Sequence, residues 1–432
     1  MKYKPLLPAR HLIFLLFCLP VLLLSSCSDE CETTVSYIRY EPVYMQRAEL
    51  SQSIKVTAPR ALQEPGKIYV RGRHLFINEI NKGIHIIDNA NPAAPRPVSF
   101  IEIPGNIDLA VKGNILYADN YIDLVALDIS NPQDVKLVNR VENLFPNHYG
   151  VLVSDTARAF VATFEEKRVT QLVTSDCNGA TPAPVFWREA DRSFAAAPSS
   201  GGKQAAMPSN GGGKGGSMAR FTISGNHLYT VSNTDLQVVD ISVASSPQKG
   251  NRIGMGWGIE TIFPYSNMLF IGSTTGMHIY DNSNPTNPVH LSSYAHVSSC
   301  DPVVVEGDLA WVTLRSGNTC ARGVNRLDVI NISNPRQPQL LKSYPMQNPH
   351  GLGIDRSTLF LCEGQYGLKI FNATDHLKVS DNLLNHFKGH DAFDVIPLGN
   401  NLMLIGKDGL YQYDYSNLKQ IKLLSKIPVT RS

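Results

Sequence analysis

The side chains of this chain that could do chemistry are spread along the sequence instead of being gathered in one motif. Eight polar residues each lie at, or within a residue of, the start of a stretch of alternating apolar residues, and successive members are 40 to 72 residues apart: Lys67, Asp108, His148, Arg220, Glu260, Asp301, His350 and Asp394. The sequence contains no Gly-x-Ser-x-Gly, His-Glu-x-x-His or Walker phosphate-loop motif. Any site must therefore be assembled by the fold from residues that are distant in sequence.

The elements that position these residues follow one repeated phrase. Each copy is a hydrophobic strand that ends in Asp or Asn, and in four copies a proline stands four residues later in an Asn-Pro turn. The strand-ending residues are Asp88, Asp128, Asp240, Asp281, Asn331, Asn372 and Asp414. Proline presets φ for a turn, the preceding Asn can close an Asx-turn, and the Asp is expected to cap backbone N–H groups there. A calcium site is not expected, because calcium needs six to eight oxygens converging on one point.

A second feature precedes each phrase: a turn of the Gly-Asn type followed by alternating apolar residues, as in Val111-Lys112-Gly113-Asn114-Ile115. Together the two features predict a four-stranded antiparallel meander. Asp88 to Asp128 is 40 residues, and the intervals from Asp240 onward are 41, 50, 41 and 42, close to the roughly 40–45 residues of a propeller blade.

Eight units result, and they start near Gly66, Asn106, His148, Met218, Ile259, Cys300, His350 and His390. A lone meander leaves a hydrophobic face and two unpaired edges, which radial packing of the units would cover. The sequence therefore predicts an all-β fold, an eight-bladed β-propeller of four-stranded antiparallel blades over residues 51–432. Seven blades is the alternative, if the unit from His148 to Val173 does not form a full blade. The segment Ser51 to Pro65 could contribute a strand that closes the ring.

A long insertion lies between the strand-ending residues Asp128 and Asp240, which are 112 residues apart. Ala195 to Ser217 is of low complexity and has too little apolar surface to fold alone. The sequence predicts a flexible Gly/Ser-rich insertion at about residues 188–217. A phosphate loop is not expected at Gly211 to Gly216, because no strand leads into it and no helix pattern follows.

The strand phrases Leu236-Gln237-Val238-Val239-Asp240 and Ile84-His85-Ile86-Ile87-Asp88 resemble the LVIVD repeat of secreted bacterial proteins. The resemblance covers about Lys67 to the C-terminus. It implies a surface propeller of undefined activity, and it brings no catalytic residues to this chain.

The N-terminus has the pattern of a secretory signal. Lys2, Lys4 and Arg10 precede an apolar run from Leu12 to Leu24, which is too short for a spanning helix of roughly 20 residues. The run ends in Leu24-Ser25-Ser26-Cys27, which resembles the lipobox of bacterial lipoproteins. That resemblance implies cleavage before Cys27 and acyl chains, palmitate among them, on this cysteine.

The first residues after the lipobox also resemble a known signal. Ser28-Asp29-Glu30 is similar to a surface-export signal of some Gram-negative lipoproteins. We therefore expect a signal peptide over 1–26, a lipidated tether over 27–50, attachment to the outer membrane and exposure to the cell exterior.

Charge argues against a nucleic-acid partner. The full chain has 39 basic and 37 acidic residues. Removing residues 1–26 takes away three basic residues and no acid, which leaves 36 against 37, a net charge of −1. A near-neutral chain lacks the basic surface that nucleic-acid binding requires.

In a propeller the innermost strand of each blade starts near the central axis. The eight polar residues from Lys67 to Asp394 are therefore predicted to surround one mouth of that axis. Two interpretations stay open: a ligand-binding mouth, or a network of opposite charges that closes a water-filled channel. His148, His350 and His390 could suggest zinc, but they lie on separate blades and need not converge, so no metal is expected. No cofactor is predicted. The loops between second and third strands open on the same face and add Glu79, Asn81, Asp119, Asn120, Tyr121, Gln365 and Tyr366.

Five cysteines remain after Cys18 and Cys27 are set aside: Cys31, Cys177, Cys300, Cys320 and Cys362. A Cys300–Cys320 disulfide is the favoured pairing, because both residues are expected on one face of the same blade; Cys362 competes for either. No pairing of a cysteine with a histidine predicts a catalytic thiol.

The functional prediction is a binding or scaffold module for a glycan or a protein partner. The alternative is a glycan-active hydrolase or lyase at the axis mouth, which would require two carboxylates about 5–9.5 Å apart; Glu260 and Asp301 are the candidate pair. A component of a larger envelope complex is a third possibility, expected to carry a large apolar patch.

Overall fold

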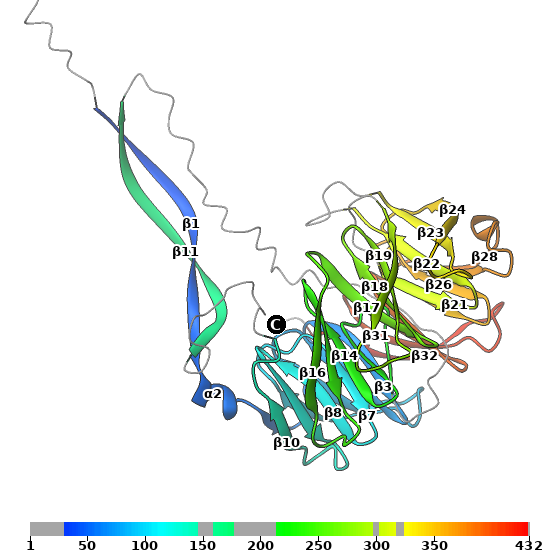
Figure 1. Ribbon diagram of the computed structural model, residues 1–432, viewed down its shortest axis with the longest axis horizontal. Helices are drawn as coiled ribbons and strands as arrows, with labels where there is room; N and C mark the ends of the chain where they lie inside the picture. The colour runs from blue at the N-terminus through cyan, green and yellow to red at the C-terminus, as the bar shows by residue number, and fades with distance from the viewer. Residues whose placement is uncertain (1–29, 146–158, 177–212, 297–301, 317–323, 431–432) are drawn as a thin grey trace, which may run out of the picture. The chain divides into compact units, whose positions relative to one another are not determined.

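The described part of this computed structural model comprises residues 30–145, 159–176, 213–296, 302–316 and 324–430. Within these ranges seven four-stranded antiparallel meanders succeed one another (Figure 1). The first, second and third blades are β3–β6 (Pro65–Arg71, His74–Glu79, Gly83–Asp88, Arg96–Glu102), β7–β10 (Leu109–Lys112, Ile115–Asn120, Asp123–Asp128, Lys136–Val141) and β13–β16 (Phe221–Ser224, His227–Val231, Asp235–Asp240, Gln248–Gly254). The fourth and fifth are β17–β20 (Ile259–Tyr265, Met268–Ser273, Gly276–Asp281, Val289–Ala295) and β21–β24 (Val303–Glu306, Leu309–Leu314, Arg326–Asn331, Gln339–Pro345). The sixth and seventh are β25–β28 (Leu352–Asp355, Thr358–Cys362, Leu368–Asn372, Leu383–Phe387) and β29–β32 (Ala392–Leu398, Asn401–Gly406, Gly409–Asp414, Lys422–Pro428).

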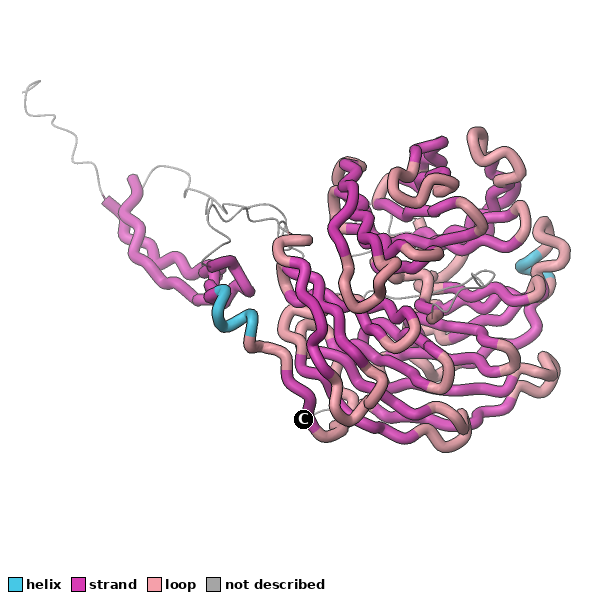
Figure 2. The backbone as a smooth tube through the Cα atoms, turned by 60° about the horizontal axis from the view of Figure 1, so that its bottom comes forward, coloured by secondary structure: helices cyan, strands magenta, loops and turns pink. Residues whose placement is uncertain are grey.

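The meanders close into a ring, which confirms the propeller. The first strand of each blade contacts the first strand of the next from β3 through β29, and β3 in turn contacts β30 of the seventh blade. Figure 2 shows the strands of these sheets stacked side by side. Buried aliphatic and aromatic side chains form clusters that span successive blade interfaces, including the one between the seventh and first blades.

The number of blades is seven, the alternative rather than the preferred number. The eighth unit expected from His148 to Val173 is not a blade: residues 146–158 lie outside the described ranges, and β11 (Ala159–Asp176) pairs with β1 (Glu30–Gln46) as a two-stranded ribbon. The sequence explains the difference, because residues 165–168 are four consecutive charged residues and all are exposed. A strand between two blades is buried on both faces and could not hold such a run. The ribbon up to Val43 and from Phe164 is a compact unit of its own.

The repeated Asp or Asn closes the same turn in every blade. Its side-chain oxygen accepts the N–H of the residue two positions later at distances of 2.7–3.1 Å, from Asp88 through Asp414. The Asn before the proline accepts a second N–H in the same way, as at Asn91 and Asn334. The predicted turn-capping role is therefore confirmed.

The turn also joins neighbouring blades. The carbonyl four residues after the anchor accepts a side-chain hydroxyl from the preceding blade at six of the seven interfaces. The pairs are Ser99 with Pro132, Tyr117 with Ala244, Tyr229 with Pro285, Ser292 with Pro335, Tyr344 with His376 and Ser425 with Pro92. One phrase thus ends a strand, closes a turn and presents an acceptor to the preceding blade.

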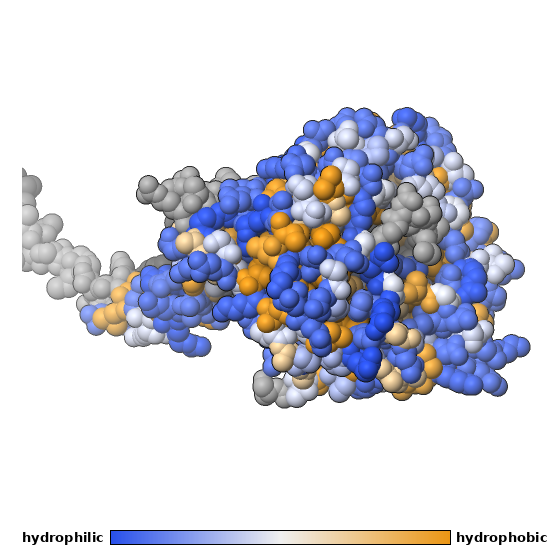
Figure 3. All heavy atoms as spheres, turned by 90° about the horizontal axis from the view of Figure 1, so that it is seen from below, coloured by the Kyte–Doolittle hydropathy of each residue, from blue (hydrophilic) through white to orange (hydrophobic). Residues whose placement is uncertain are grey.

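A β-bulge in the fourth strand helps to aim these hydroxyls. In all seven blades the register between third and fourth strands shifts by one residue. In three blades the serine just after the extra residue is the one that reaches the neighbouring turn: Ser99, Ser292 and Ser425. The bulge also interrupts an outer edge to which another sheet could otherwise add. Exposed leucines such as Leu341 and Leu384 lie at these bulges. On the face of the molecule drawn in Figure 3, hydrophobic residues form small groups among hydrophilic ones.

The ring is closed by side chains and one bridge, not by a shared strand. Leu62 forms an isolated parallel bridge with Val429, and the amides of Asn89 and Gln412 exchange hydrogen bonds of 2.9 and 2.7 Å. The expected extra strand from the Ser51 to Pro65 segment exists as β2 (Lys55–Thr57), but it pairs with β6 of the first blade. No helix in the described ranges is long and apolar enough to span a membrane.

The end of the Gly-rich insertion re-enters the propeller. β12 (Lys214–Gly215) pairs antiparallel with β3, the innermost strand of the first blade. The N–H of Gly213 reaches the carbonyl of Val111 in the second blade (3.0 Å), and Lys214 Nζ reaches that of Pro397 in the seventh (2.8 Å). A Cβ on Gly216 would lie 2.1 Å from a carboxylate oxygen of Asp394. The segment therefore links three blades from the inside of the ring, while residues 188–212 of the predicted insertion lie outside the described ranges.

Candidate functional site

The predicted axis-mouth residues separate into groups. The structure brings Lys67, Asp108 and Arg220 together on the first, second and third blades. His350 and Glu260 both lie near Arg315, a residue that the sequence pattern did not single out. Asp394 lies against Gly216, and His148 and Asp301 are outside the described ranges.

Lys67 and Asp108 form a buried ion pair with an Nζ to Oδ2 distance of 2.8 Å. The same carboxylate also accepts the backbone N–H groups of Arg220, Phe221 (3.1 Å) and Leu109 (2.7 Å). Burial lowers the pKa of Lys67, and the Asp108 carboxylate opposes that shift. Asp108 is thus fully engaged in tying three blades together, as the charge-network interpretation predicts.

Asp119, at the end of β8, is a second buried carboxylate behind the mouth. Its Oδ1 accepts the N–H groups of Ile107 and Asp108, both at 2.9 Å, and the amide of Asn106 at 2.8 Å. Burial raises the pKa of Asp119 to about 7, although the hydrogen bonds from Asp108 and Ile107 oppose the shift. This carboxylate changes charge near neutral pH while remaining bonded to its loop.

A small cleft opens between the second and third blades beside these residues. Its volume is about 60 Å³. Its lining residues are Ile107, Asp108, Asp119, Phe145, Arg220, Phe221, Val231, Ser232, Asn233, Asp235 and Arg252. Phe145 and Phe221 stack with their ring centroids 5.7 Å apart and so give the cleft an apolar wall.

The charges that line the cleft are paired with one exception. Asp235 accepts from Arg252 at 3.3 Å, and Arg252 also donates to the carbonyl of Leu144. Asp108 and Asp119 are bonded as described above. The guanidinium of Arg220 forms no hydrogen bond or ion pair that the structure records for the described residues, although its backbone N–H is held by Asp108. Arg220 is therefore the charge left available to a ligand.

The opposite side of the mouth is built differently. Burial lowers the pKa of His350 to about 3, and the positive charge of Arg315 adds to the shift. Burial also lowers the pKa of Arg315, which Glu260 opposes. His350 is therefore neutral at physiological pH. Within the described ranges no group of three His, Cys, Asp or Glu side chains is arranged to hold a metal ion.

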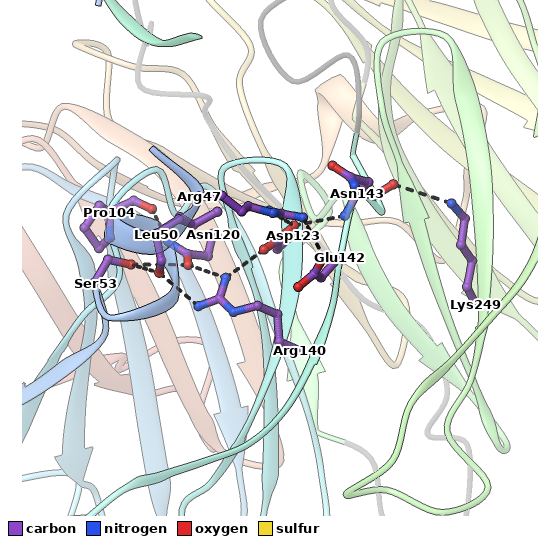
Figure 4. Close-up of polar contacts among 10 residues, drawn as sticks. All are labelled: Arg47, Leu50, Ser53, Pro104, Asn120, Asp123, Arg140, Glu142, Asn143 and Lys249. Atoms are coloured by element: carbon purple, nitrogen blue, oxygen red, sulfur yellow. Dashed lines mark hydrogen bonds and ion pairs between the residues drawn. The ribbon is translucent and has the colours of Figure 1, made fainter. Parts of the chain in front are cut away.

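Outside the mouth, one carboxylate anchors the chain that enters the propeller. Asp123 is fully buried and binds Arg47 of the short helix α2 (Arg47–Ser51) at 2.7 Å and Arg140 of β10 at 2.9 Å (Figure 4). Arg140 also donates to the carbonyl of Leu50, and Asn143 N–H donates to Asp123. The sequence analysis did not single out this cluster, although Asp123 and Asp235 both lie five residues before an anchor and each pairs with an arginine of the fourth strand.

The predicted disulfide partners Cys300 and Cys320 lie outside the described ranges, so that pairing stays a prediction, as does lipidation of Cys27. Cys362 is buried at the end of β26. The residues that sequence analysis missed at the cleft are Phe145, Asp235 and Arg252. Asp235 begins the third strand of its blade and Arg252 lies on the fourth, whereas the predicted mouth residues lie at the starts of innermost strands.

Comparison with known proteins supports the fold. The LVIVD repeat matches residues 106–143, 215–251, 264–296 and 301–345, which correspond to the second to fifth blades. No curated protein sequence matches the chain.

Two solved structures with a TM-score above 0.5 show the same kind of fold, and a third aligns just below that score. The periplasmic gluconolactonase PpgL of Pseudomonas aeruginosa aligns with a TM-score of 0.53 and 10% identity, over 84% of this chain and 98% of PpgL. The computationally designed protein Ika8 gives 0.51 and 10%, over 87% and 91%. PorZ, a surface component of the type-IX secretion system of Porphyromonas gingivalis, gives 0.49 and 13%, over 87% of this chain but 39% of PorZ. At such identities the likeness concerns the fold alone, and we conclude that the chain carries LVIVD repeats and folds as a seven-bladed β-propeller.

Proposed function

We propose that this protein is an outer-membrane lipoprotein, facing the cell exterior, whose propeller is a binding or scaffold module for a glycan or a protein partner. The observation that carries the proposal is the cleft between the second and third blades. There the guanidinium of Arg220, which has no hydrogen bond or ion pair among the described residues, lies next to an aromatic wall and a fixed network of carboxylates. Such a combination of apolar surface and a few convergent polar groups is typical of binding sites.

The membrane part of the proposal depends on Cys27. Cys27→Ser should remove the acylated residue, so the protein should move from the membrane fraction to the soluble fraction after cell lysis. Cys31→Ser, four residues further along, is the matched control and should stay with the membrane. Equal partition of the two variants would contradict lipid anchoring at Cys27.

The binding part is tested with the purified full chain on a glycan array and in capture from native membranes. A double variant, Arg220→Ala with Phe145→Ala, should lose the ligands that the wild type retains. Arg96→Ala removes an exposed rim arginine whose side chain is 77% accessible, and it should bind as the wild type does. Unchanged binding by the double variant would place the ligand elsewhere.

The hydrolase or lyase alternative draws no support from the described residues. Its candidate pair was Glu260 with Asp301, and Asp301 lies outside the described ranges while Glu260 lies near Arg315. Of the three carboxylates of the cleft, Asp108 and Asp119 are each held by several hydrogen bonds within the protein, and Asp235 is paired with Arg252.

A further inference from the structure

We infer that the cleft between the second and third blades takes an acidic side chain of a protein partner, with Arg220 binding its carboxylate. This inference rests on the proposed binding function and names the chemistry of the same site. The charge of the cleft, its size and the apolar character of its wall each support this assignment.

Charge comes first. Each carboxylate of the cleft already has a positive or hydrogen-bonding partner: Asp108 has Lys67, Asp235 has Arg252, and Asp119 has three donors. Arg220 also lies close enough to Lys67 to depress the pKa of that amine. The Arg220 guanidinium is therefore the cation of the cleft that has no hydrogen bond or ion pair among the described residues. An arginine fork is suited to a carboxylate, which it can bind through two parallel hydrogen bonds.

The size of the cleft distinguishes between the two ligand classes that could supply a carboxylate, a protein side chain and an acidic sugar. The cleft holds about 60 Å³, whereas one water needs roughly 10–15 Å³ measured in the same way. The space therefore suits four or five heavy atoms, which is a carboxylate with one or two methylene groups. A hexuronic acid ring is more than twice that size, so the cleft favours the side chain of Asp or Glu over an acidic sugar.

The wall of the cleft fits the rest of such a side chain. Phe145 and Phe221 stack beside Arg220, and their rings give apolar contact for methylene groups. Ser232 and Asn233 come from the loop between β14 and β15 at the same opening. A chain segment that crosses this opening could present an acidic side chain to Arg220 while its backbone stays outside.

The test uses small probes that isolate the side chain. N-acetyl-glutamate amide and N-acetyl-glutamine amide have nearly the same shape and differ in charge. We expect the glutamate probe to perturb NMR signals of cleft residues in the full-length protein, and the glutamine probe to bind at least about tenfold more weakly, since one charge-assisted bond is lost. Glucuronate is the third probe and should bind no better than glutamine amide.

Two charge-matched variants complete the experiment. Arg220→Gln should abolish the preference for glutamate, whereas Arg96→Gln makes the same change in net charge on the rim and should leave it intact. Equal binding of glutamate and glutamine probes, or stronger binding of glucuronate, would overturn the inference. If partner capture depends on Phe145 but not on Arg220, the inference falls while the proposed function stands. If neither residue matters, the inference falls and the partner binds outside this cleft; if the wild type captures no partner, the proposed function falls.

Discussion

At the scale of single residues, the carboxylates of this protein divide into those that hold the ring together and those that close turns. Asp108 and Asp123 are buried and each binds cations or N–H groups from more than one segment. The anchor aspartates Asp128, Asp240, Asp281 and Asp414 are only half-buried and bind within their own turn. The loss in free energy of unfolding when a carboxylate is removed should therefore depend on how deeply it is buried rather than on its number of contacts. The reason is that a cation left without its counter-ion is destabilising only when it is away from water.

Asp123 gives the sharpest case. Asp123→Ala leaves Arg47 and Arg140 without their shared counter-ion, and their side chains are only 16% and 12% accessible. We expect a loss of about 3 kcal/mol in the free energy of unfolding, measured by chemical denaturation. Glu142→Ala removes the other, 65% accessible partner of Arg47 and should change stability by less than about 0.5 kcal/mol. Similar losses for both variants would contradict the role given to burial.

Asp119 predicts a pH dependence. Its pKa is raised by burial from 3.8 to about 7, so the folded state holds a proton that the unfolded state has released. The stabilisation from this group is complete below about pH 3.8 and disappears as pH rises through about 7. In Asp119→Asn this position no longer titrates. The thermal midpoint of the wild type should therefore fall relative to that of the variant when the pH is raised from 5 to 8. A constant difference over that range would show that Asp119 does not titrate there.

At the scale of the element, most of the architecture was predictable because one local pattern does several jobs. The strand ending in Asp or Asn, the Asn-Pro turn and the Gly-Asn turn specify a four-stranded unit without reference to the rest of the chain. The inter-blade acceptor was not predictable. It depends on which residue of the neighbouring blade follows the bulge, as with Ser292 and Pro335, and bulges leave little trace in sequence.

The capping role of the anchor residues can be tested with a substitution that the chain itself contains, Asn in place of Asp. Asn331 and Asn372 do the same capping as the aspartates, so Asp240→Asn should keep the bond to the N–H of Ser242, while Asp240→Ala should lose it at a cost of about 1 kcal/mol near pH 7. The Ser242 N–H lowers the pKa of Asp240 in the folded protein. The stabilisation by this carboxylate is therefore complete above its unfolded pKa and is lost as the pH falls through the lower, folded pKa. Thermal midpoints of the three proteins at neutral and acidic pH test this. Equal destabilisation by Asn and Ala would refute the capping role.

At the scale of the whole molecule, the ring is closed from its rim and from its inside. The rim contacts are the Leu62–Val429 bridge and the Asn89–Gln412 amide pair. Inside, the segment from Gly213 to Gly216 links the first, second and seventh blades. The sequence indicated only a flexible insertion there, because glycine-rich composition is equally typical of a linker and of a chain that must pass close to other backbones. The blade number was open for a related reason: hydrophobic residues around Val161 fit a blade strand, and the charged run that follows them does not.

The inner segment should be sensitive to a single methyl group. Gly216→Ala places a Cβ 2.1 Å from an oxygen of Asp394, with no positive φ to add strain, and we expect a lower thermal midpoint and faster proteolysis of the insertion. Gly254→Ala is the control, since its Cβ would meet nothing within 4 Å, and it should be neutral or slightly stabilising. An unchanged midpoint for Gly216→Ala would mean that the segment contributes nothing to ring closure.

The acceptor carbonyl four residues after each anchor has a consequence for how such rings can evolve. Each blade comes from one stretch of chain, and the first five carry both halves of the joint, a hydroxyl for the blade ahead and a carbonyl for the blade behind. Tandem duplication or loss of one stretch would therefore create a new neighbour pair whose joint is already compatible. Rings of different size would then need adjustment of curvature only, with no new recognition chemistry between the units.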